Sequence, residues 1–264
     1  MNNKIKIAFF DIDGTLASNI NKNPNTLDRV PKSALKTLKQ LKENGITPVV
    51  ATGRGRVGVS PFIKELGLDS FISANGQSLI YKNQEIYKKY IDPTIVKEAL
   101  NQLIEINDIT IGLETSIGRV LCRTNEKSGL PNLPFVESIE DCLNQAINYN
   151  VYQLSLYGEN LKNKVPRNIS DLEAIVVAPT AMNILPKNVS KALGIEKMLE
   201  ILGLSRMEAI AFGDEENDLE MFKAVDYSVA MGNANSELKK IASFVTSDVD
   251  DDGIYKACIH FDLI

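Results

Sequence analysis

The chain has 264 residues and a net charge of −5, with 24% charged and 44% hydrophobic residues. This length suits one large domain or two of ordinary size, and the apolar fraction can fill a core. Lys and Arg form no basic run, which argues against nucleic acid as the main partner. No apolar run approaches the length of a membrane span.

The first predicted element is a strand at residues 5–10, an apolar run that leads into Asp11-Ile12-Asp13-Gly14. Strand side chains alternate, so Asp11 and Asp13 should emerge on the same side, and Gly14 permits a sharp turn. Two adjacent carboxylates repel each other unless a cation or a shared proton offsets their charge. Ligands of open α/β sheets bind beyond the carboxyl ends of strands. The pair is therefore a candidate site, although plain turns and calcium loops also use this pattern.

A helix at 31–44, with an apolar stripe and a stop at Gly45, precedes a second strand at 47–51. This strand ends in Thr52-Gly53, and a helix should follow. The hydroxyl of Thr52 and the free amides of the loop could hold a phosphate group. The competing interpretation is a simple helix cap.

A third strand at 71–73 precedes a region of different character, from about residue 83 to residue 186. In the segment 151–157, apolar and polar residues alternate, which is typical of an antiparallel sheet. Further strands are predicted at 118–123, 174–178 and 182–185, with a helix at 93–106. We interpret this region as an inserted α+β domain.

Helices and apolar strands alternate again after the insertion, with helices at 190–202 and 235–242 and strands at 208–212, 227–231 and 244–246. Strands without polar alternation are expected where helices cover both faces of a sheet. We therefore predict an α/β fold with a doubly wound parallel (Rossmann-like) sheet. Its two parts would be residues 1–82 and 187–264, and the inserted domain would span 83–186.

Two further candidates lie after the insertion. Lys191 opens a helix, where the positive end of the helix dipole disfavours it. It is either a solvated surface lysine or an ammonium held in place for a bound phosphoryl group. Asp214 and Asp218 follow the strand at 208–212. They could mark an acidic helix start, or Asp214 beside Asp11 could bind magnesium, which prefers oxygen ligands.

The order of these motifs resembles that of the haloacid dehalogenase-like superfamily of aspartate-nucleophile phosphatases. Asp-x-Asp-Gly-Thr is followed by Thr-Gly-Arg, then Lys, then Gly-Asp-x-x-Asn-Asp. Segments 73–76 and 230–234 make the chain similar to the Cof-type phosphatases with the larger α/β (type IIB) cap, and the resemblance covers the whole chain. One departure is Ala192, where the family usually has Gly.

The resemblance implies a role for each matched residue. Asp11 would be the nucleophile and Asp13 the general acid and base; Mg²⁺ would be bound by Asp11, Asp214 and the backbone carbonyl of Asp13. The phosphoryl group would be held by Thr52, Gly53 and Lys191, with Asn217 nearby. Asp218 would support Lys191 or the metal shell, and Asn75 is a candidate for substrate contact. Substrate specificity would come from the cap, where the candidates are Glu114, Arg119, Arg123 and Tyr157.

Three widely spaced cysteines, Cys122, Cys142 and Cys258, are typical of free thiols in a reducing cytosol. The first residues carry no targeting segment. We therefore expect a cytoplasmic protein without a membrane partner, either a monomer or a small homo-oligomer.

The sequence thus predicts a Mg²⁺-dependent phosphatase of small phosphorylated metabolites, such as sugar phosphates or a phosphorylated cofactor, that works through an aspartyl phosphate. One alternative is a phosphomutase or phosphotransferase of sugar phosphates, since some mutases of the superfamily share these motifs and this cap type. The other is a catalytically silent sensor of a phosphorylated ligand, against which the intact set of motif residues argues.

Overall fold

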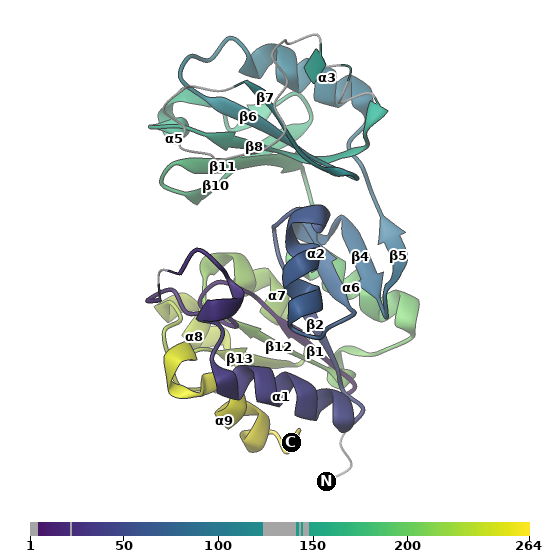
Figure 1. The fold of residues 1–264 in the computed structure, drawn as a ribbon, viewed down its shortest axis with the longest axis vertical. Coiled ribbons are helices and arrows are strands. Elements are labelled where there is room, and N and C mark those ends of the chain that lie inside the picture. The colour runs from purple at the N-terminus through teal and green to yellow at the C-terminus, as the bar shows by residue number, and fades with distance from the viewer. Residues whose placement is uncertain (1–4, 22, 124–140, 143, 145–147) are drawn as a thin grey trace. The chain divides into compact units, whose positions relative to one another are not determined.

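The computed structural model describes residues 5–21, 23–123, 141, 142, 144 and 148–264. The chain divides into two compact units. The first unit consists of residues 1–53, 59–88 and 190–264, and the second of residues 54–58 and 89–189. Figure 1 shows the elements of both units. The longer segment of the second unit, residues 89–189, overlaps the predicted insertion at 83–186, and residues 54–58 belong to the second unit as well.

The first unit is built on one eight-stranded sheet. Its strands lie in the order β14 (Phe244–Val245), β13 (Tyr227–Ala230), β12 (Ala209–Gly213), β1 (Ile7–Phe10), β2 (Thr47–Ala51), β3 (Phe71–Ser73), β4 (Ser78–Tyr81), β5 (Gln84–Lys88). Pairing is parallel from β14 to β3 and antiparallel from β3 to β5. The predicted α/β fold with a parallel sheet is confirmed.

Helices cover both faces of this sheet, and the alternation of β1 shows how. Ala8 and Phe10 belong to the core cluster formed with α1 (Lys32–Glu43), α2 (Arg56–Glu65) and α9 (Gly253–His260). Ile7 and Phe9 belong to the opposite cluster, formed with α6 (Lys191–Leu202), α7 (Leu219–Lys223) and α8 (Ser236–Ile241). Both sets are buried, which explains the continuous apolar run.

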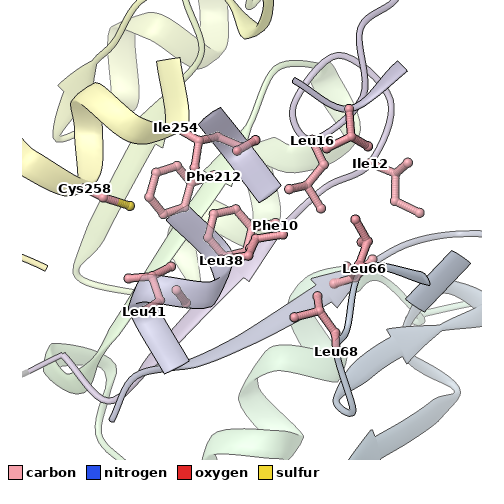
Figure 2. Packing of buried hydrophobic residues seen from close by; sticks show 14 of the residues in the cluster. Phe10, Ile12, Leu16, Leu38, Leu41, Leu66, Leu68, Phe212, Ile254 and Cys258 are labelled. Carbon is pink, nitrogen blue, oxygen red and sulfur yellow. The ribbon is translucent and has the colours of Figure 1, made fainter. Parts of the chain in front are cut away.

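Figure 2 shows the first of these clusters, in which Phe10 of β1 and Phe212 of the neighbouring strand β12 lie side by side. Their rings stack with centroids 4.6 Å apart, an arrangement worth about 0.5–1.5 kcal/mol beyond the buried area. Leu38 and Leu41 of α1 and Ile254 of α9 pack in the same cluster. The cluster thereby fixes the ends of β1 and β12, the strands that lead into Asp11 and Asp214.

The second unit contains one antiparallel sheet of six strands. Their order is β7 (Gly118–Arg123), β6 (Thr110–Thr115), β8 (Val151–Tyr157), β11 (Ala181–Pro186), β10 (Leu172–Ala178), β9 (Asn168–Ile169). Helix α3 (Pro93–Leu103) contributes Val96 and Leu100 to a core with Leu113, Leu154 and Ile184 of the sheet. A short helix, α5 (Leu161–Lys164), also belongs to this unit. The side chains of Cys122 and Arg123 lie outside the described residues.

The cysteines differ from the prediction. Cys258 is a buried free thiol, as expected, but Cys142 is disulfide-bonded. The prediction of three free thiols was therefore wrong, because spacing along a sequence does not reveal which cysteines the fold brings together. Since disulfides are rare in the cytosol, the cysteines do not support a cytoplasmic location. Among the described residues, no helix is long and apolar enough to cross a membrane.

Candidate active site

Asp11 lies directly after β1, where the sheet pairing continues for one more residue. Its backbone N–H donates to the carbonyl of Phe212 on β12 at 3.1 Å. The chain then turns tightly, because Ala17 N–H donates to the carbonyl of Ile12 and Gly14 N–H donates to that of Ala17. Gly14 has φ +88°, and a Cβ there would lie 2.0 Å from Asp214 Oδ2. Only glycine fits this turn, because any side chain would displace Asp214.

Lys191 lies at the start of α6 and contacts two carboxylates. The hydroxyl of Ser190 caps the helix by accepting from Leu193 N–H at 3.3 Å. The ammonium Nζ donates to Asp11 Oδ1 at 2.6 Å and to Asp218 Oδ1 at 2.8 Å. Lys191 and Asp218 are almost completely buried. Two carboxylates thus stabilise an ammonium that the helix dipole disfavours.

Asp214 follows β12 and is held by the loop after β1. Thr15 Oγ1 donates to Asp214 Oδ1 at 2.8 Å, and both residues are buried. Asp218, the last residue of the short 3-10 helix η4 (Glu216–Asp218), accepts from the backbone N–H of Asp214 at 3.0 Å and of Glu215 at 3.2 Å. The carboxylate of Asp218 therefore braces the turn that carries Asp214.

These acids form a compact group. Asp11, Asp214 and Asp218 each offer a carboxylate oxygen, and the three oxygens lie within 4.8 Å of one another. Lys191 pairs with Asp11 and Asp218, whereas the described residues include no ion-pair partner for Asp214. Three buried acids therefore outnumber the cation that balances them.

Burial dominates the electrostatics of the group. It raises the pKa of Asp11 to about 6, against the opposing effect of Lys191. Burial also raises the pKa of Asp214 to about 8, opposed by the hydrogen bond from Thr15 and reinforced by Asp11 and Asp218. Burial alone would lower the pKa of Lys191, but the two carboxylates outweigh it and raise that pKa. A divalent cation would relieve the excess negative charge, and carboxylate oxygens are the ligands that Mg²⁺ prefers.

A second group of predicted residues lies after β2 and β3. Asn75, in the left-handed conformation, donates its backbone N–H to the carbonyl of Thr52 at 3.3 Å. A Cβ on Gly53 would lie 2.9 Å from Asn75 Oδ1, and one on Gly76 would lie 2.3 Å from the carbonyl of Ser190. The loop after β2, with Thr52 and Gly53, therefore lies against the loop after β3, with Asn75, and Gly76 of the second loop packs against the start of α6. Asn217, by contrast, is exposed in η4.

The side chain of Asp13, unlike those of the three buried acids, is partly exposed. It is 47% exposed and forms an ion pair with Arg29 Nη2. Asp11, only two residues earlier in the chain, pairs instead with the buried Lys191. Arg29 closes the short 3-10 helix η1 (Leu27–Arg29). The prediction that Asp11 and Asp13 emerge on the same side assumed that the strand stays extended as far as Asp13. Residues 12–17 form a turn instead, and Asp13 lies in that turn.

Three of the candidate specificity residues contact one another in the second unit. Glu114 on β6 accepts from the guanidinium of Arg119 on β7 and from Ser155 Oγ on β8, the latter at 3.4 Å. The guanidinium of Arg119 lies 5.7 Å from the ring centroid of Tyr157. The register pairs Glu114 with Arg119 and Gln153, so these polar groups share one face of the sheet.

Sequence reasoning missed three residues that shape the site. Thr15 lies within the quoted motif but received no role, and Asn233 donates from Nδ2 to the carbonyl of Gly14 at 2.8 Å. Their places in recognisable motifs could have indicated both. Arg29 lies in no motif, and no pattern in the sequence connects it to Asp13.

Comparison with known proteins identifies relatives over nearly the full chain. Residues 8–258 match the family model of the haloacid dehalogenase-like hydrolases. YkrA of Bacillus subtilis strain 168, named as a candidate phosphatase, is 34% identical over 252 residues, which cover 94% of this chain and 95% of YkrA.

Solved structures show the same similarity. BT1666 of Bacteroides thetaiotaomicron, described among phosphatases of this superfamily, is 29% identical with a TM-score of 0.83; the match covers 100% of this chain and 97% of BT1666. BT4131, described as a subclass IIB sugar phosphatase, is 27% identical with a TM-score of 0.79; that match covers 98% of this chain and 100% of BT4131.

Proposed function

The chain belongs to the haloacid dehalogenase-like hydrolases of the Cof type, and we propose that it is a Mg²⁺-dependent phosphatase of sugar phosphates or similar phosphorylated metabolites. Phosphatase activity on small phosphorylated molecules follows from the family and its relatives. The proposed Mg²⁺ dependence rests on one observation: the buried carboxylate of Asp11 lies 2.6 Å from the ammonium of Lys191 and beside two further acids.

The residues present fit a divalent cation. Asp11 and Asp214 would bind it together with the backbone carbonyl of Asp13, since carboxylate oxygens of Asp11, Asp214 and Asp218 lie within 4.8 Å of one another. A bound Mg²⁺ supplies positive charge that offsets the repulsion between an anionic phosphate and an anionic nucleophile. Asp218, which braces Asp214 and pairs with Lys191, would support this arrangement.

The proposed reaction has two steps. A carboxylate oxygen of Asp11 attacks phosphorus, the bond from phosphorus to the substrate oxygen breaks, and Asp13 gives its proton to that oxygen. Water then attacks phosphorus and passes a proton to Asp13, the bond between the Asp11 oxygen and phosphorus breaks, and inorganic phosphate leaves the restored Asp11. A covalent intermediate divides one difficult displacement into two easier ones.

The phosphoryl oxygens would be bound by Lys191, the hydroxyl of Thr52 and the amide of Gly53. Lys191 is already fixed by two carboxylates, so little reorganisation is needed when charge develops on the phosphoryl group. Asn217 is exposed in η4 and would complete this group from its edge. Asn75 lies in the neighbouring loop, hydrogen-bonded to Thr52, and would contact the substrate beside Thr52 and Gly53.

The test is phosphate release from a panel of sugar phosphates and phosphorylated cofactor precursors. We expect turnover with MgCl₂, none after chelation, and recovery when Mg²⁺ is restored. Asp11→Asn, which preserves shape but removes the nucleophilic charge, should lower turnover by about a thousandfold or more. Retained activity in this variant would contradict the nucleophile assignment. Isomerisation of a sugar phosphate faster than phosphate release would instead identify a mutase.

A further inference from the structure

The exposed carboxylate of Asp13 is held by a residue that no motif contains. The guanidinium of Arg29 pairs with Asp13 through Nη2, and the Arg29 side chain is only 18% exposed. A charged hydrogen bond from a largely buried guanidinium is stronger than an ordinary surface ion pair. The contact therefore restricts the rotamers that the Asp13 side chain can adopt.

The backbone holds Arg29 firmly in place. Its N–H donates to the carbonyl of Thr26 at 3.1 Å, and its carbonyl accepts from Ser18 N–H at 2.9 Å. Val30, the next residue, is buried in the core cluster below the sheet end. Ser18 belongs to the same loop as Asp13. A backbone hydrogen bond and a side-chain ion pair therefore both connect Arg29 to this loop.

The Nε atom of Arg29 is buried and has no hydrogen-bond partner among the described residues. An unsatisfied buried donor costs stability, so packing alone does not favour arginine at this position. Nη2 makes an ion pair with Asp13, and a lysine at this position could also supply a positive charge to Asp13. The contact with Asp13 is thus the interaction through which this side chain can act.

We propose that Arg29 is a positioning residue for Asp13. The contact with Arg29 fixes the carboxyl group of Asp13 in the orientation from which this group transfers a proton to the leaving oxygen. This inference rests on the proposed function, in which Asp13 is the general acid. Arg29 acts through Asp13 and contacts neither the substrate nor Asp11. Its loss should therefore slow the first step only for substrates whose leaving oxygen needs a proton, whereas any effect on the second step, in which Asp13 takes a proton from water, should be the same for all substrates.

Two aryl phosphates separate this effect from general damage. p-Nitrophenolate is a stable anion and leaves without a proton, whereas phenolate, whose conjugate acid resembles the tyrosine side chain with a pKa of about 10, benefits from one. We expect Arg29→Ala to raise the ratio of kcat/KM for p-nitrophenyl phosphate to kcat/KM for phenyl phosphate about tenfold, a fraction of what general acid catalysis contributes. A ratio of two rates does not depend on the fraction of folded enzyme.

Three variants complete the design. Arg29→Lys should return the ratio to within about twofold of the wild type, and Arg206→Ala, which removes the Arg206–Asp226 ion pair elsewhere in the same unit, should leave it unchanged. In an Asp13→Asn background, Arg29→Ala should have no further effect on the ratio, as expected for residues that act as a unit.

An unchanged ratio in Arg29→Ala, or an equal effect with and without Asp13, would overturn the inference while leaving the phosphatase intact. A wild-type enzyme that releases phosphate from neither ester, nor from any metabolite of the panel, would instead contradict the proposed function. The concentration of Mg²⁺ that gives half-maximal activity should not change in Arg29→Ala. A large change would mean that Arg29 shapes the metal site and would also overturn the inference.

Discussion

Lys191 and Asp11 are 180 positions apart in the chain, yet Nζ of the lysine lies 2.6 Å from Oδ1 of the aspartate. The contact joins the start of α6 to the end of β1. It therefore connects the two chain segments, one before and one after the inserted domain, that build the first unit. Because both side chains are buried, the pair contributes to folding as well as to the proposed chemistry.

Replacing Lys191 by Met should impair both properties. The change keeps the length of the side chain but leaves Asp11 and Asp218 buried without a cation. Breaking a buried ion pair on one side costs about 3–5 kcal/mol, so we expect a loss of about 3 kcal/mol in the free energy of unfolding, measured in urea without metal. Phosphate release should fall by at least about a hundredfold.

The matched control is Lys197→Met on the same helix. Lys197 pairs with Glu200 at 2.9 Å on the surface, and exposed pairs contribute about 0–1 kcal/mol. This variant should unfold within about 0.5 kcal/mol of the wild type. Similar losses in both variants would show that the contact of Lys191 with Asp11 has no special role.

Much of the fold could be predicted because its signals are local. The apolar runs at β1, β2 and β12 are continuous where helices cover both faces, and Gly45 and Gly203 end α1 and α6. The strand β6, by contrast, was not predicted, since Gly112 interrupts its pattern and its partners β7 and β8 supply the pairing. Strand pairing of this kind depends on tertiary context.

The site was predictable only as far as its motifs reach. Asp11, Lys191, Asp214 and Asp218 come from separate strand ends and helix starts, and parallel topology brings such ends to one edge. The alternation of the strand does not extend to Asp13, because the chain turns at residues 12–17. Arg29 and the disulfide of Cys142 depend on contacts between segments that no sequence period connects.

Gly14→Ala should displace Asp214. The alanine would adopt φ +88° and place its Cβ 2.0 Å from Asp214 Oδ2. Gly45→Ala is the control, since it has φ +79° but no atom within 4 Å of the added Cβ. Both variants should lose about 1 kcal/mol from backbone strain. We expect Gly14→Ala to lose about 2 kcal/mol more in urea unfolding, together with most of its phosphatase activity. Equal losses would exclude the clash.

The buried thiol of Cys258 should make stability fall at high pH. Burial raises its pKa to about 12, whereas an unfolded thiol has a pKa of about 8.5. The folded pKa is the higher one, so this contribution to stability is complete below the unfolded pKa and is lost progressively as pH rises toward the folded pKa.

Between pH 8 and pH 10, the free energy of unfolding should therefore fall by about 2 kcal/mol more in the wild type than in Cys258→Ala. The cavity left by alanine lowers stability at every pH and does not affect this difference. Parallel pH profiles, measured by urea unfolding, would mean that the thiol ionises in the folded protein as readily as in the unfolded chain.

Thr15→Val should weaken metal binding through Asp214. Valine matches the shape of threonine but removes the hydroxyl that donates to Asp214 Oδ1 at 2.8 Å. Loss of a hydrogen bond that orients a metal ligand typically lowers metal affinity about 10–100-fold. The concentration of MgCl₂ that gives half-maximal phosphate release should therefore rise at least about tenfold, with a smaller change in the rate at saturation. Thr15→Ser keeps the hydroxyl and should resemble the wild type. If valine and serine required the same Mg²⁺ concentration, Asp214 would not depend on Thr15 for its orientation.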